Sequence, residues 1–193
     1  ASLEKLDITK DRYNTKIKTK GGYGVVEGAI KSYLDNYAVL LHDTLVLVQD
    51  PQLTSILSYD NYEKDGPTFD KSLKYLESLK KTYNDNMETL IEMSNEEAIQ
   101  DYIYKRTDDS YYCDLYMELM LSDSMKSDFQ ETEELLNRAK TRTNHIFEVS
   151  ENVLTFLVSN KDDWVLEDAE IKFRTDALYN QYQSYISQLT SNS

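Results

Sequence analysis

Apolar residues recur every three or four positions along most of this chain, which is the spacing of amphipathic helices. The pattern is strongest over residues 26–48 and 69–93. It is longest from Met125 to Leu157, where it runs for over thirty residues without Gly or Pro. Shorter helical patterns lie between these stretches, and a last one follows residue 175. The sequence therefore predicts an all-α protein, an elongated antiparallel bundle of about five to seven helices with short connections.

One segment, which reads "DDWVLEDAEIKF", alternates apolar and polar residues as a β-strand does. Trp164 and Leu166 fall on one face of an extended arm, as do Ile171 and Phe173 on a second arm. We expect the arms to pair as a small β-like hook near residues 164–173. We interpret the four apolar side chains as a structural clasp that closes the apolar end of the bundle, with a ligand site as the alternative. The clasp predicts that Trp164 is largely buried.

No internal repeat and no Gly- or Pro-rich linker divides the sequence, which predicts a single helical-bundle domain over residues 1–193. Residues 1–20 are polar with weak helical spacing, and we interpret them as either a tether or an N-terminal helix. The "GGYG" that follows, residues 21–24, invites comparison with a nucleotide-binding loop. Gly22, Gly24 and Gly28 miss the dinucleotide fingerprint by one position, and no buried strand precedes them. A turn between helices is the better interpretation.

The formal net charge of −14 comes from 35 Asp and Glu against 21 Lys and Arg. Nucleic-acid binding needs a basic face, so this charge argues against it. Residues 1–20 differ, with six basic and three acidic residues. A basic start on an acidic body suits a segment near an anionic membrane, although a solvated polar face explains it equally well. No apolar run approaches the roughly 20 residues that a membrane-spanning helix needs, so no span is predicted.

The candidate chemistry is sparse. Cys113, the only cysteine, lies among apolar and aromatic positions, which favours a buried role over a reactive thiol. The segment "NYEKDG" starts like a calcium loop but has Ser72 where that loop needs a bidentate acid, so an interhelical turn is predicted. His145 and Glu148 lie three residues apart, yet no second such pair accompanies them to form a dinuclear site. No serine-nucleophile or phosphate-loop motif occurs. We therefore expect no enzyme activity, no metal and no cofactor.

Sixteen tyrosines are the main compositional excess. A tyrosine packs its ring while its hydroxyl stays in contact with water, which suits a thin bundle whose core is near solvent. Tyrosine is also common at binding interfaces, which leaves a dedicated binding surface as the alternative. The tyrosines at core-spaced positions of the expected helices are Tyr33, Tyr37, Tyr75, Tyr83, Tyr102, Tyr116, Tyr182 and Tyr185.

The stretch "FLVSNKDDWVLEDAEIKFRTDALYNQYQSYISQL" resembles the closing segment of uncharacterised bacterial extracytoplasmic, lipoprotein-type helical domains. In that pattern a helix ends in a Phe-Leu pair and an Asn-Lys turn. A Trp, a short acidic hook and a helix with a Tyr-centred apolar stripe follow. The residues that carry the resemblance are Phe156, Leu157, Asn160, Lys161, Trp164, Glu167, Asp168, Ile171, Phe173, Leu178, Tyr182 and Leu189. The upstream "LLHDTLVLVQDPQ" and "DGPTFDKSLKYL" are also similar, so the resemblance covers most of the chain.

The resemblance implies a non-enzymatic cell-envelope interaction or binding module that is extracytoplasmic, bacterial and membrane-tethered. Its partner is expected to be an unknown protein or other envelope component. The lipobox cysteine and signal peptide of such domains are not in this chain, so membrane attachment is expected only through an anchor outside it. The alternative is a small-molecule-binding or sensor domain with an inter-helix pocket lined by Tyr and Trp. Ala169 replaces the usual glycine of the hook, which predicts a turn that needs no positive φ.

Overall fold

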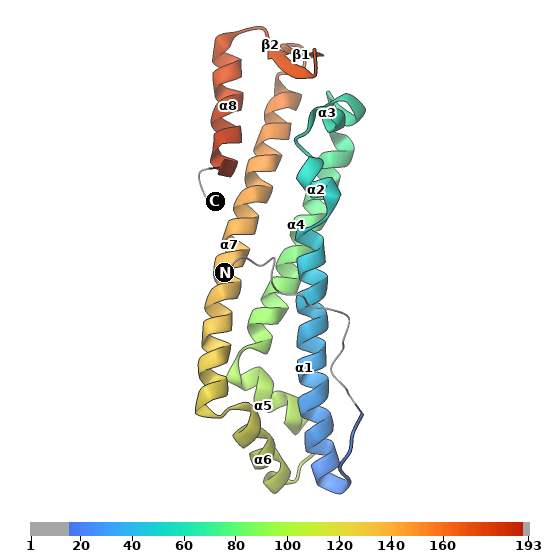
Figure 1. The fold of residues 1–193 in the computed structure, drawn as a ribbon, viewed down its shortest axis with the longest axis vertical. Coiled ribbons are helices and arrows are strands. Elements are labelled where there is room, and N and C mark those ends of the chain that lie inside the picture. The colour runs from blue at the N-terminus through green and yellow to red at the C-terminus, as the bar shows by residue number, and fades with distance from the viewer. Residues whose placement is uncertain (1–15, 191–193) are drawn as a thin grey trace. The chain divides into compact units, whose positions relative to one another are not determined.

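The structure is a computed structural model that describes residues 16–190. Within that range its regular secondary structure is helical except for one two-stranded antiparallel sheet, so the expected helical bundle with a small β hook is confirmed (Figure 1). Residues 16–20 are exposed and form no helix, and the rest of the expected tether or N-terminal helix lies outside the described residues. The elements are α1 (Gly21–Val48), α2 (Pro51–Ser55), α3 (Tyr59–Asp65), α4 (Asp70–Met93), α5 (Glu96–Tyr104), α6 (Ser110–Met120), α7 (Asp123–Ser159), β1 (Trp164–Glu167), β2 (Glu170–Phe173) and α8 (Asp176–Thr190).

The chain divides into two compact units, each made of two separate stretches. The first unit comprises Ala1–Leu45 and Asp85–Asn137, and the second comprises Val46–Asn84 and Arg138–Ser193. The boundaries between the units fall inside α1, α4 and α7, so each of these helices contributes residues to both. A single domain over the whole chain stays a prediction.

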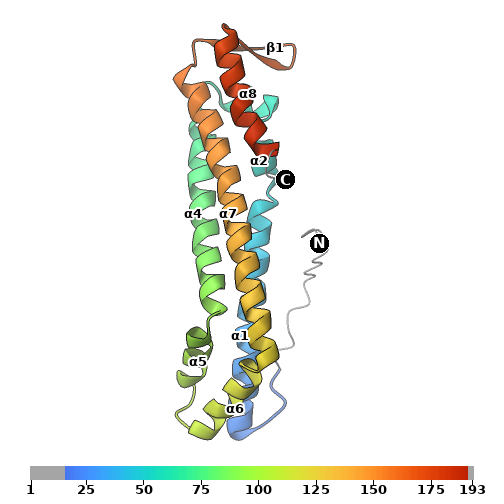
Figure 2. The same ribbon diagram turned by 90° about the vertical axis from the view of Figure 1, so that its left-hand side faces the viewer.

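The core of the first unit is formed mainly by α1, α5 and α6. Figures 1 and 2 show α6 beside the first turns of α1. The buried residues of each helix follow one another at intervals of three or four positions, so one face of each helix enters the core. Fully burying a Val, Ile or Met side chain contributes about 1.5–3 kcal/mol. The buried core residues are Val26, Ala29, Tyr33, Ile99, Ile103, Cys113, Tyr116 and Met120.

The "GGYG" segment is not the expected turn between helices but the first turn of α1, which begins at Gly21. Gly21 has a φ of 60°, a left-handed conformation that glycine adopts readily. A Cβ on Gly22 would lie 2.0 Å from the nearest atom of the Tyr112 ring on α6. The glycines therefore permit the entry into α1 and the close approach of α6. These tertiary demands outweigh the low helix propensity of glycine, from which the turn was inferred.

In the second unit, α7 continues through residues 141–145 without a break, and α8 returns antiparallel beside it (Figure 2). Phe147, Leu154 and Leu157 of α7 are fully buried. The ring of Tyr83 on α4 packs edge-on against Phe147, with 5.6 Å between the ring centroids. The unit is therefore a helical layer whose core is supplied by α7 and covered by α4.

The "NYEKDG" segment belongs to helix α3 rather than to the expected interhelical turn. Ser58 caps α3, because its Oγ accepts a hydrogen bond from the backbone N–H of Asn61. Asp65 ends α3 and accepts hydrogen bonds of 2.7 Å from both the amide and the hydroxyl of Ser72 in α4. Burial acts to raise the pKa of Asp65, but these hydrogen bonds outweigh it and hold the pKa below its usual value. A helix this short shows too little of the helical period to be recognised from its sequence pattern.

Candidate functional site

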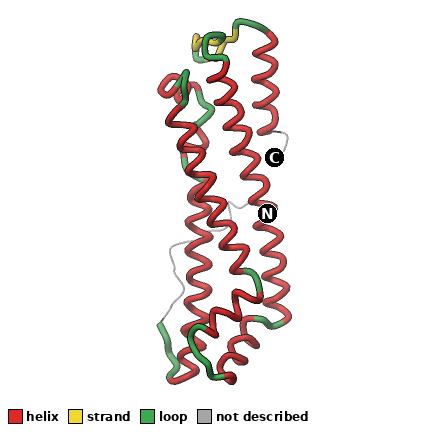
Figure 3. Tube along the Cα trace, turned by 180° about the vertical axis from the view of Figure 1, so that it is seen from behind, coloured by secondary structure: helices red, strands yellow, loops and turns green. Residues whose placement is uncertain are grey.

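The hairpin carries the four residues interpreted as a clasp. Its strands pair with Trp164 opposite Phe173 and Leu166 opposite Ile171 (strands yellow in Figure 3). All four side chains therefore lie on one face of the hairpin. Trp164 is 8% exposed, and the other three are half-buried. The structure brings the four residues together in the second unit, while their role as a clasp stays a prediction.

Trp164 joins the hairpin to the end of α7 and to the start of α4. Its indole N–H donates a hydrogen bond of 2.8 Å to the backbone carbonyl oxygen of Leu157. Its ring stacks on that of Phe69, with 6.1 Å between centroids and 24° between planes. Phe69 is fully buried and has a φ of 52°, which is rare for a bulky residue. A Cβ on Gly66 would lie 3.2 Å from Phe69 and 3.3 Å from Trp164, so glycine lets the two rings sit against the loop.

Phe173 connects the other arm of the hairpin to two helices. Its ring centroid lies 6.0 Å from that of Phe156 on α7 and 5.3 Å from that of Tyr182 on α8. Phe156 also contacts Tyr185, one turn further along α8, at 5.8 Å. The hairpin thus contacts α7 and α8 through Phe173, and the loop before α4 through Trp164.

The turn of the hairpin corrects the sequence interpretation. Glu167 pairs directly with Glu170, which leaves Asp168 and Ala169 as a two-residue loop. Their φ angles are 55° and 61°. Positive φ at both central residues is the type I′ turn, which matches the twist of a hairpin and favours glycine. The expectation of a turn without positive φ is therefore wrong. The strand register places the apolar side chains on one face, and it overrides the local preference of Ala169.

A pocket of about 350 Å³ lies beside the hairpin in the second unit, and we call it the tyrosine pocket. Two helices each contribute a pair of tyrosines three residues apart, which places each pair on one helix face. Tyr59 and Tyr62 come from α3, and Tyr179 and Tyr182 come from α8. The hydroxyl oxygens of Tyr62 and Tyr182 are 3.1 Å apart and share a hydrogen bond. The lining residues are Leu57, Tyr59, Tyr62, Ala169, Glu170, Ile171, Tyr179, Tyr182 and Gln183.

The tyrosine pocket offers aromatic rings with neutral hydroxyls. Burial raises the pKa of both Tyr62 and Tyr182, so these phenols keep their protons at all ordinary pH values. Tyr179 is 48% exposed, so part of the lining is open to solvent. Among the described residues that line the pocket, none is Lys or Arg. The pocket is therefore suited to an apolar or cationic ligand rather than to an anion.

A second pocket, of about 270 Å³, lies between α1 and α6 in the first unit, and we call it the α1–α6 groove. Its lining residues are Thr19, Tyr23, Val26, Glu27, Ile30, Lys31, Leu115 and Leu119. Tyr23 packs edge-on against Tyr111 and Tyr112 of α6, with ring centroids 6.4 and 5.3 Å apart. The hydroxyls of Tyr23 and Tyr111 are 3.2 Å apart. Aromatic side chains therefore hold the rim of this groove in place.

One wall of the α1–α6 groove is held by Glu27. Its Oε2 accepts hydrogen bonds from the amides of Lys18 and Thr19 at 2.9 and 2.8 Å, and from the Thr19 hydroxyl at 2.7 Å. Its Oε1 pairs with the ammonium of Lys31 at 2.6 Å. The hydrogen bond from Lys31, followed by those from Thr19 and Lys18, lowers the pKa of Glu27 to about 2. Glu27 therefore stays ionised and fixes the segment before α1 along the helix.

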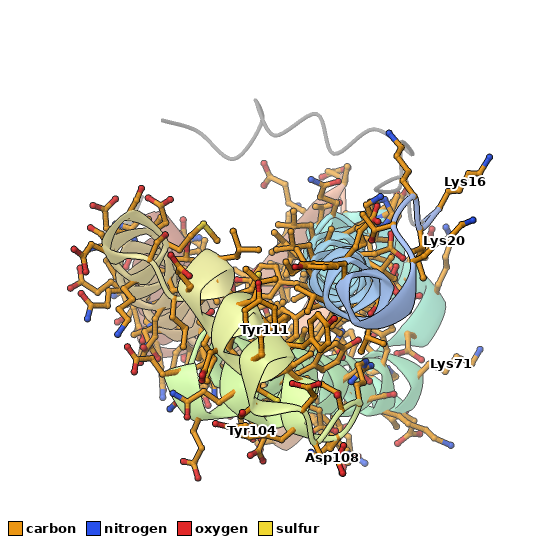
Figure 4. All side chains as sticks on the ribbon, turned by 90° about the horizontal axis from the view of Figure 1, so that it is seen from below. Lys16, Lys20, Lys71, Tyr104, Asp108 and Tyr111 are labelled. Carbon is orange, nitrogen blue, oxygen red and sulfur yellow. The ribbon has the colours of Figure 1, made fainter. Side chains whose placement is uncertain are left out.

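The other wall of the groove is formed by Leu115 and Leu119 of α6, a helix that also carries exposed acidic residues. Tyr111 is 58% exposed on α6, and Figure 4 shows it on this helix, with Lys16 and Lys20 extending outward from the segment before α1. Asp114 and Glu118 are exposed on the same helix. Residues 85–137, which belong to the first unit, carry 15 Asp and Glu but only three Lys and Arg. The groove thus lies beside a strongly negative part of the chain.

Cys113 and His145, the candidate chemical groups outside the two pockets, have surroundings that fit a role in packing. Cys113 is buried in the core of the first unit, as expected, and burial raises the pKa of its thiol. The Nε2 atom of His145 lies 3.4 Å from the backbone oxygen of Gln188 on α8. Within residues 16–190, no group of three or more His, Cys, Asp or Glu is placed to hold a metal ion. Because burial favours its protonated form, the thiol of Cys113 is poorly suited to act as a nucleophile.

The tyrosines at core-spaced positions are buried or half-buried, in agreement with the packing interpretation. The sequence interpretation did not single out Tyr59 and Tyr179 of the tyrosine pocket, or Tyr23 and Tyr111 of the groove rim. The spacing of three residues between Tyr59 and Tyr62, and again between Tyr179 and Tyr182, is a signal in the sequence. It shows a shared helix face, but not that the two faces meet.

Comparison of the chain with protein families, curated proteins and solved structures finds no match. Among the helices of the described chain, none is both long and apolar enough to cross a membrane. The described residues form an all-helical bundle with a β hairpin inserted before its last helix, and the tyrosine pocket and the α1–α6 groove are its candidate sites.

Proposed function

We propose that this protein is a non-catalytic binding module of the bacterial cell envelope, and that the α1–α6 groove is its main contact surface. The observation that carries the proposal is the grouping of solvent-exposed Tyr23, Tyr111 and Leu119 around an apolar groove. Aromatic residues beside apolar pockets supply much of the binding energy of protein interfaces. Scattered exposed apolar residues need no explanation, whereas a grouped set marks an interaction surface.

The charge around the groove defines the chemistry of the partner. The excess of acidic residues between positions 85 and 137 creates a negative potential that attracts a basic partner. On the opposite wall, the ammonium of Lys31 is already paired with Glu27 and bonded to the carbonyl of Lys16. We therefore expect a protein segment with apolar anchors flanked by Lys or Arg, whose association is steered by charge.

The non-catalytic part of the proposal has support from the sequence and from Cys113. The chain carries no recognised nucleophile or phosphate-loop motif. The thiol of Cys113 is held in the protonated form by burial, and a thiol must be ionised to attack a substrate.

The extracytoplasmic and membrane-tethered location is supported by the lipoprotein-type resemblance of the C-terminal segment. The basic residues among positions 1–20 also suit an anionic membrane surface. The gene sequence upstream of this chain provides the test. A signal peptide with a lipobox cysteine supports the tether, and an upstream sequence that encodes neither a signal peptide nor an anchor rules it out.

The contact surface is tested with two synthetic amphipathic helical peptides of equal length, one of Leu and Lys and one of Leu and Glu. We expect the basic peptide to bind, and its affinity to fall with added salt, because charge steers the association. Leu119→Lys places a positive charge in the groove and should abolish this binding. Leu135→Lys makes the same change at an exposed leucine of α7, outside the groove, and should leave most of it intact. Equal binding of both peptides, or equal effects of both substitutions, would refute the proposed surface.

A second candidate function is small-molecule binding at the tyrosine pocket. Its volume of about 350 Å³ lies within the usual range of ligand sites, about 300–1,000 Å³. Four of its nine lining residues are tyrosines, which combine an aromatic ring with a hydroxyl, and Glu170 and Gln183 add polar groups. This candidate concerns the second unit alone and is independent of the α1–α6 groove.

A further inference from the structure

We infer that the tyrosine pocket recognises a quaternary ammonium group, such as that of choline. The inference rests on small-molecule binding at this pocket, the second candidate function, and names the class of ligand. Quaternary ammonium ions are recognised by groups of aromatic rings, because the negative face of each ring attracts a cation that has no hydrogen to donate. The tyrosine pocket offers four such rings from two helices.

The arrangement of the rings favours this ligand class. Each helix contributes its tyrosines at i and i+3, so both rings of a pair lie on one helix face. The hydrogen bond between the hydroxyls of Tyr62 and Tyr182 joins the two pairs and holds them in a fixed relation. Both of these rings are buried, whereas Tyr59 and Tyr179 are partly open to solvent. A cation that enters from solvent would therefore contact mainly the rings of Tyr59 and Tyr179.

The apolar part of the pocket suits the methyl groups of such a ligand. Leu57 and Ile171 lie in the lining together with the tyrosines. The transfer of methyl groups from water to an apolar surface is favourable, and the positive charge that they surround is attracted by the aromatic rings. A primary ammonium, by contrast, has three N–H donors, each of which must find an acceptor when the group leaves water.

The local charge also favours a cation. The elements that form the pocket, namely α3, the hairpin and α8, together carry seven Asp and Glu and two Lys. The pKa of Lys172 is raised chiefly by its hydrogen bonds to Glu167 and Asp168, and the charge of Glu170 adds to this effect. One of the two lysines, Lys172, is held in ion pairs with Glu167 and Asp168, at 2.9 and 3.0 Å. The net potential around the pocket is therefore negative, which concentrates cations and repels anions.

The central experiment is a calorimetric titration of the chain with choline. The matched ligand is the neutral alcohol in which a carbon atom replaces the choline nitrogen, because it has nearly the same shape and no charge. We expect choline to bind about tenfold more tightly than the alcohol, the difference that cation–π attraction to several rings provides. A rise in melting temperature with choline should accompany binding, since the ligand stabilises only the native state.

Three variants locate the site. Tyr179→Leu removes an outer ring and should weaken choline binding about tenfold, whereas Tyr179→Phe keeps the ring and should retain it within about twofold. Tyr104→Leu alters an exposed tyrosine of α5 outside the pocket and should have no effect. Because Tyr179 is half-exposed, its loss is not expected to unfold the chain, and circular dichroism checks this directly.

Lipid headgroups carry the same ammonium group as free choline, so sedimentation with phosphatidylcholine and phosphatidylglycerol vesicles distinguishes the two sources. Binding to choline, or selectively to phosphatidylcholine, supports the inference and assigns the source. Equal affinity for choline and the neutral alcohol would overturn the cation specificity while leaving small-molecule binding in place. No binding of choline, alcohol or vesicles by the folded chain would overturn the inference, as would unchanged binding by Tyr179→Leu.

Discussion

The indole N–H of Trp164 donates a hydrogen bond of 2.8 Å to the backbone carbonyl oxygen of Leu157. Leu157 lies in the last turn of α7, where carbonyl groups have no partner within the helix. The preceding carbonyl, that of Phe156, accepts from the amide and the side chain of Asn160. The hairpin thus supplies a hydrogen-bond donor to the end of α7 while its apolar face packs within the second unit.

Trp164→Ala is expected to unfold the second unit rather than only remove a function. The change deletes the stacking on Phe69 and leaves the Leu157 carbonyl unpaired, and such large-to-small changes cost about 3–5 kcal/mol. That is a large part of the total stability of a domain, about 5–15 kcal/mol. Urea denaturation followed by circular dichroism measures the change. Val165→Ala, at the exposed neighbour on the opposite face, should alter stability by less than about 0.5 kcal/mol. A Trp164→Ala variant as stable as the parent would rule out the clasp.

Ala169→Gly is expected to stabilise the protein. Ala169 has a φ of 61°, and a left-handed conformation costs a non-glycine residue about 1–2 kcal/mol. Glycine removes that cost but gains freedom in the unfolded chain, so a net gain of about 0.5–1 kcal/mol is expected. The matched change Ala139→Gly, within α7, should instead destabilise by about 0.5–1 kcal/mol. Thermal unfolding of both variants gives the comparison, and a loss of stability in Ala169→Gly would contradict the type I′ turn.

Tyr116→Phe is expected to keep or increase stability, unlike most changes at buried positions. Tyr116 is fully buried in the core of the first unit, and its hydroxyl has no hydrogen-bond partner among the described residues. A buried unsatisfied polar group costs about 1–3 kcal/mol, which the phenylalanine avoids. Tyr33→Phe is the control, since the Tyr33 hydroxyl donates to the carbonyl of Met93, and its loss should cost about 0.5–1.5 kcal/mol. Denaturant midpoints that fall equally for both variants would show that the Tyr116 hydroxyl is satisfied in solution.

Glu27→Gln is expected to destabilise the protein near neutral pH and to have less effect in acid. The pKa of Glu27 is lowered from 4.5 to about 2 in the folded chain, chiefly by the hydrogen bond from Lys31. A lowered pKa means that the stabilisation is fully present above pH 4.5 and is lost as the pH falls towards 2. Urea denaturation over this pH range should show the difference between parent and variant shrinking with acidification.

The control for this pH series is Glu63→Gln, which neutralises an exposed carboxylate on α3. It should not reproduce the loss of stability at neutral pH. A difference between Glu27→Gln and the parent that stays constant from neutral pH to pH 2 would contradict the role of Glu27 in holding the segment before α1.

The helical period was sufficient to predict long elements such as α4 and α7, because many turns repeat the same apolar face. The alternation of apolar and polar residues was sufficient to predict the hairpin. Each arm has two apolar residues at an interval of two, Trp164 and Leu166 in one and Ile171 and Phe173 in the other. The sequence pattern predicted a turn where α3 lies, because this helix spans too few turns to show a helical period. The prediction also failed at Gly21–Gly24, where packing against Tyr112 outweighs the helix-breaking tendency of glycine.

The sequence by itself determined the all-helical class, the interrupting hairpin, the burial of Trp164 and Cys113 and the acidic character, since these follow from local periodicity and composition. Only the tertiary structure decided that Tyr59 and Tyr179 line one pocket, that Glu27 holds the amides of Lys18 and Thr19, and that Ala169 adopts positive φ. Each of these depends on how separate elements pack and pair. Packing and strand register override local preferences, because many buried contacts together outweigh the cost of a single strained residue.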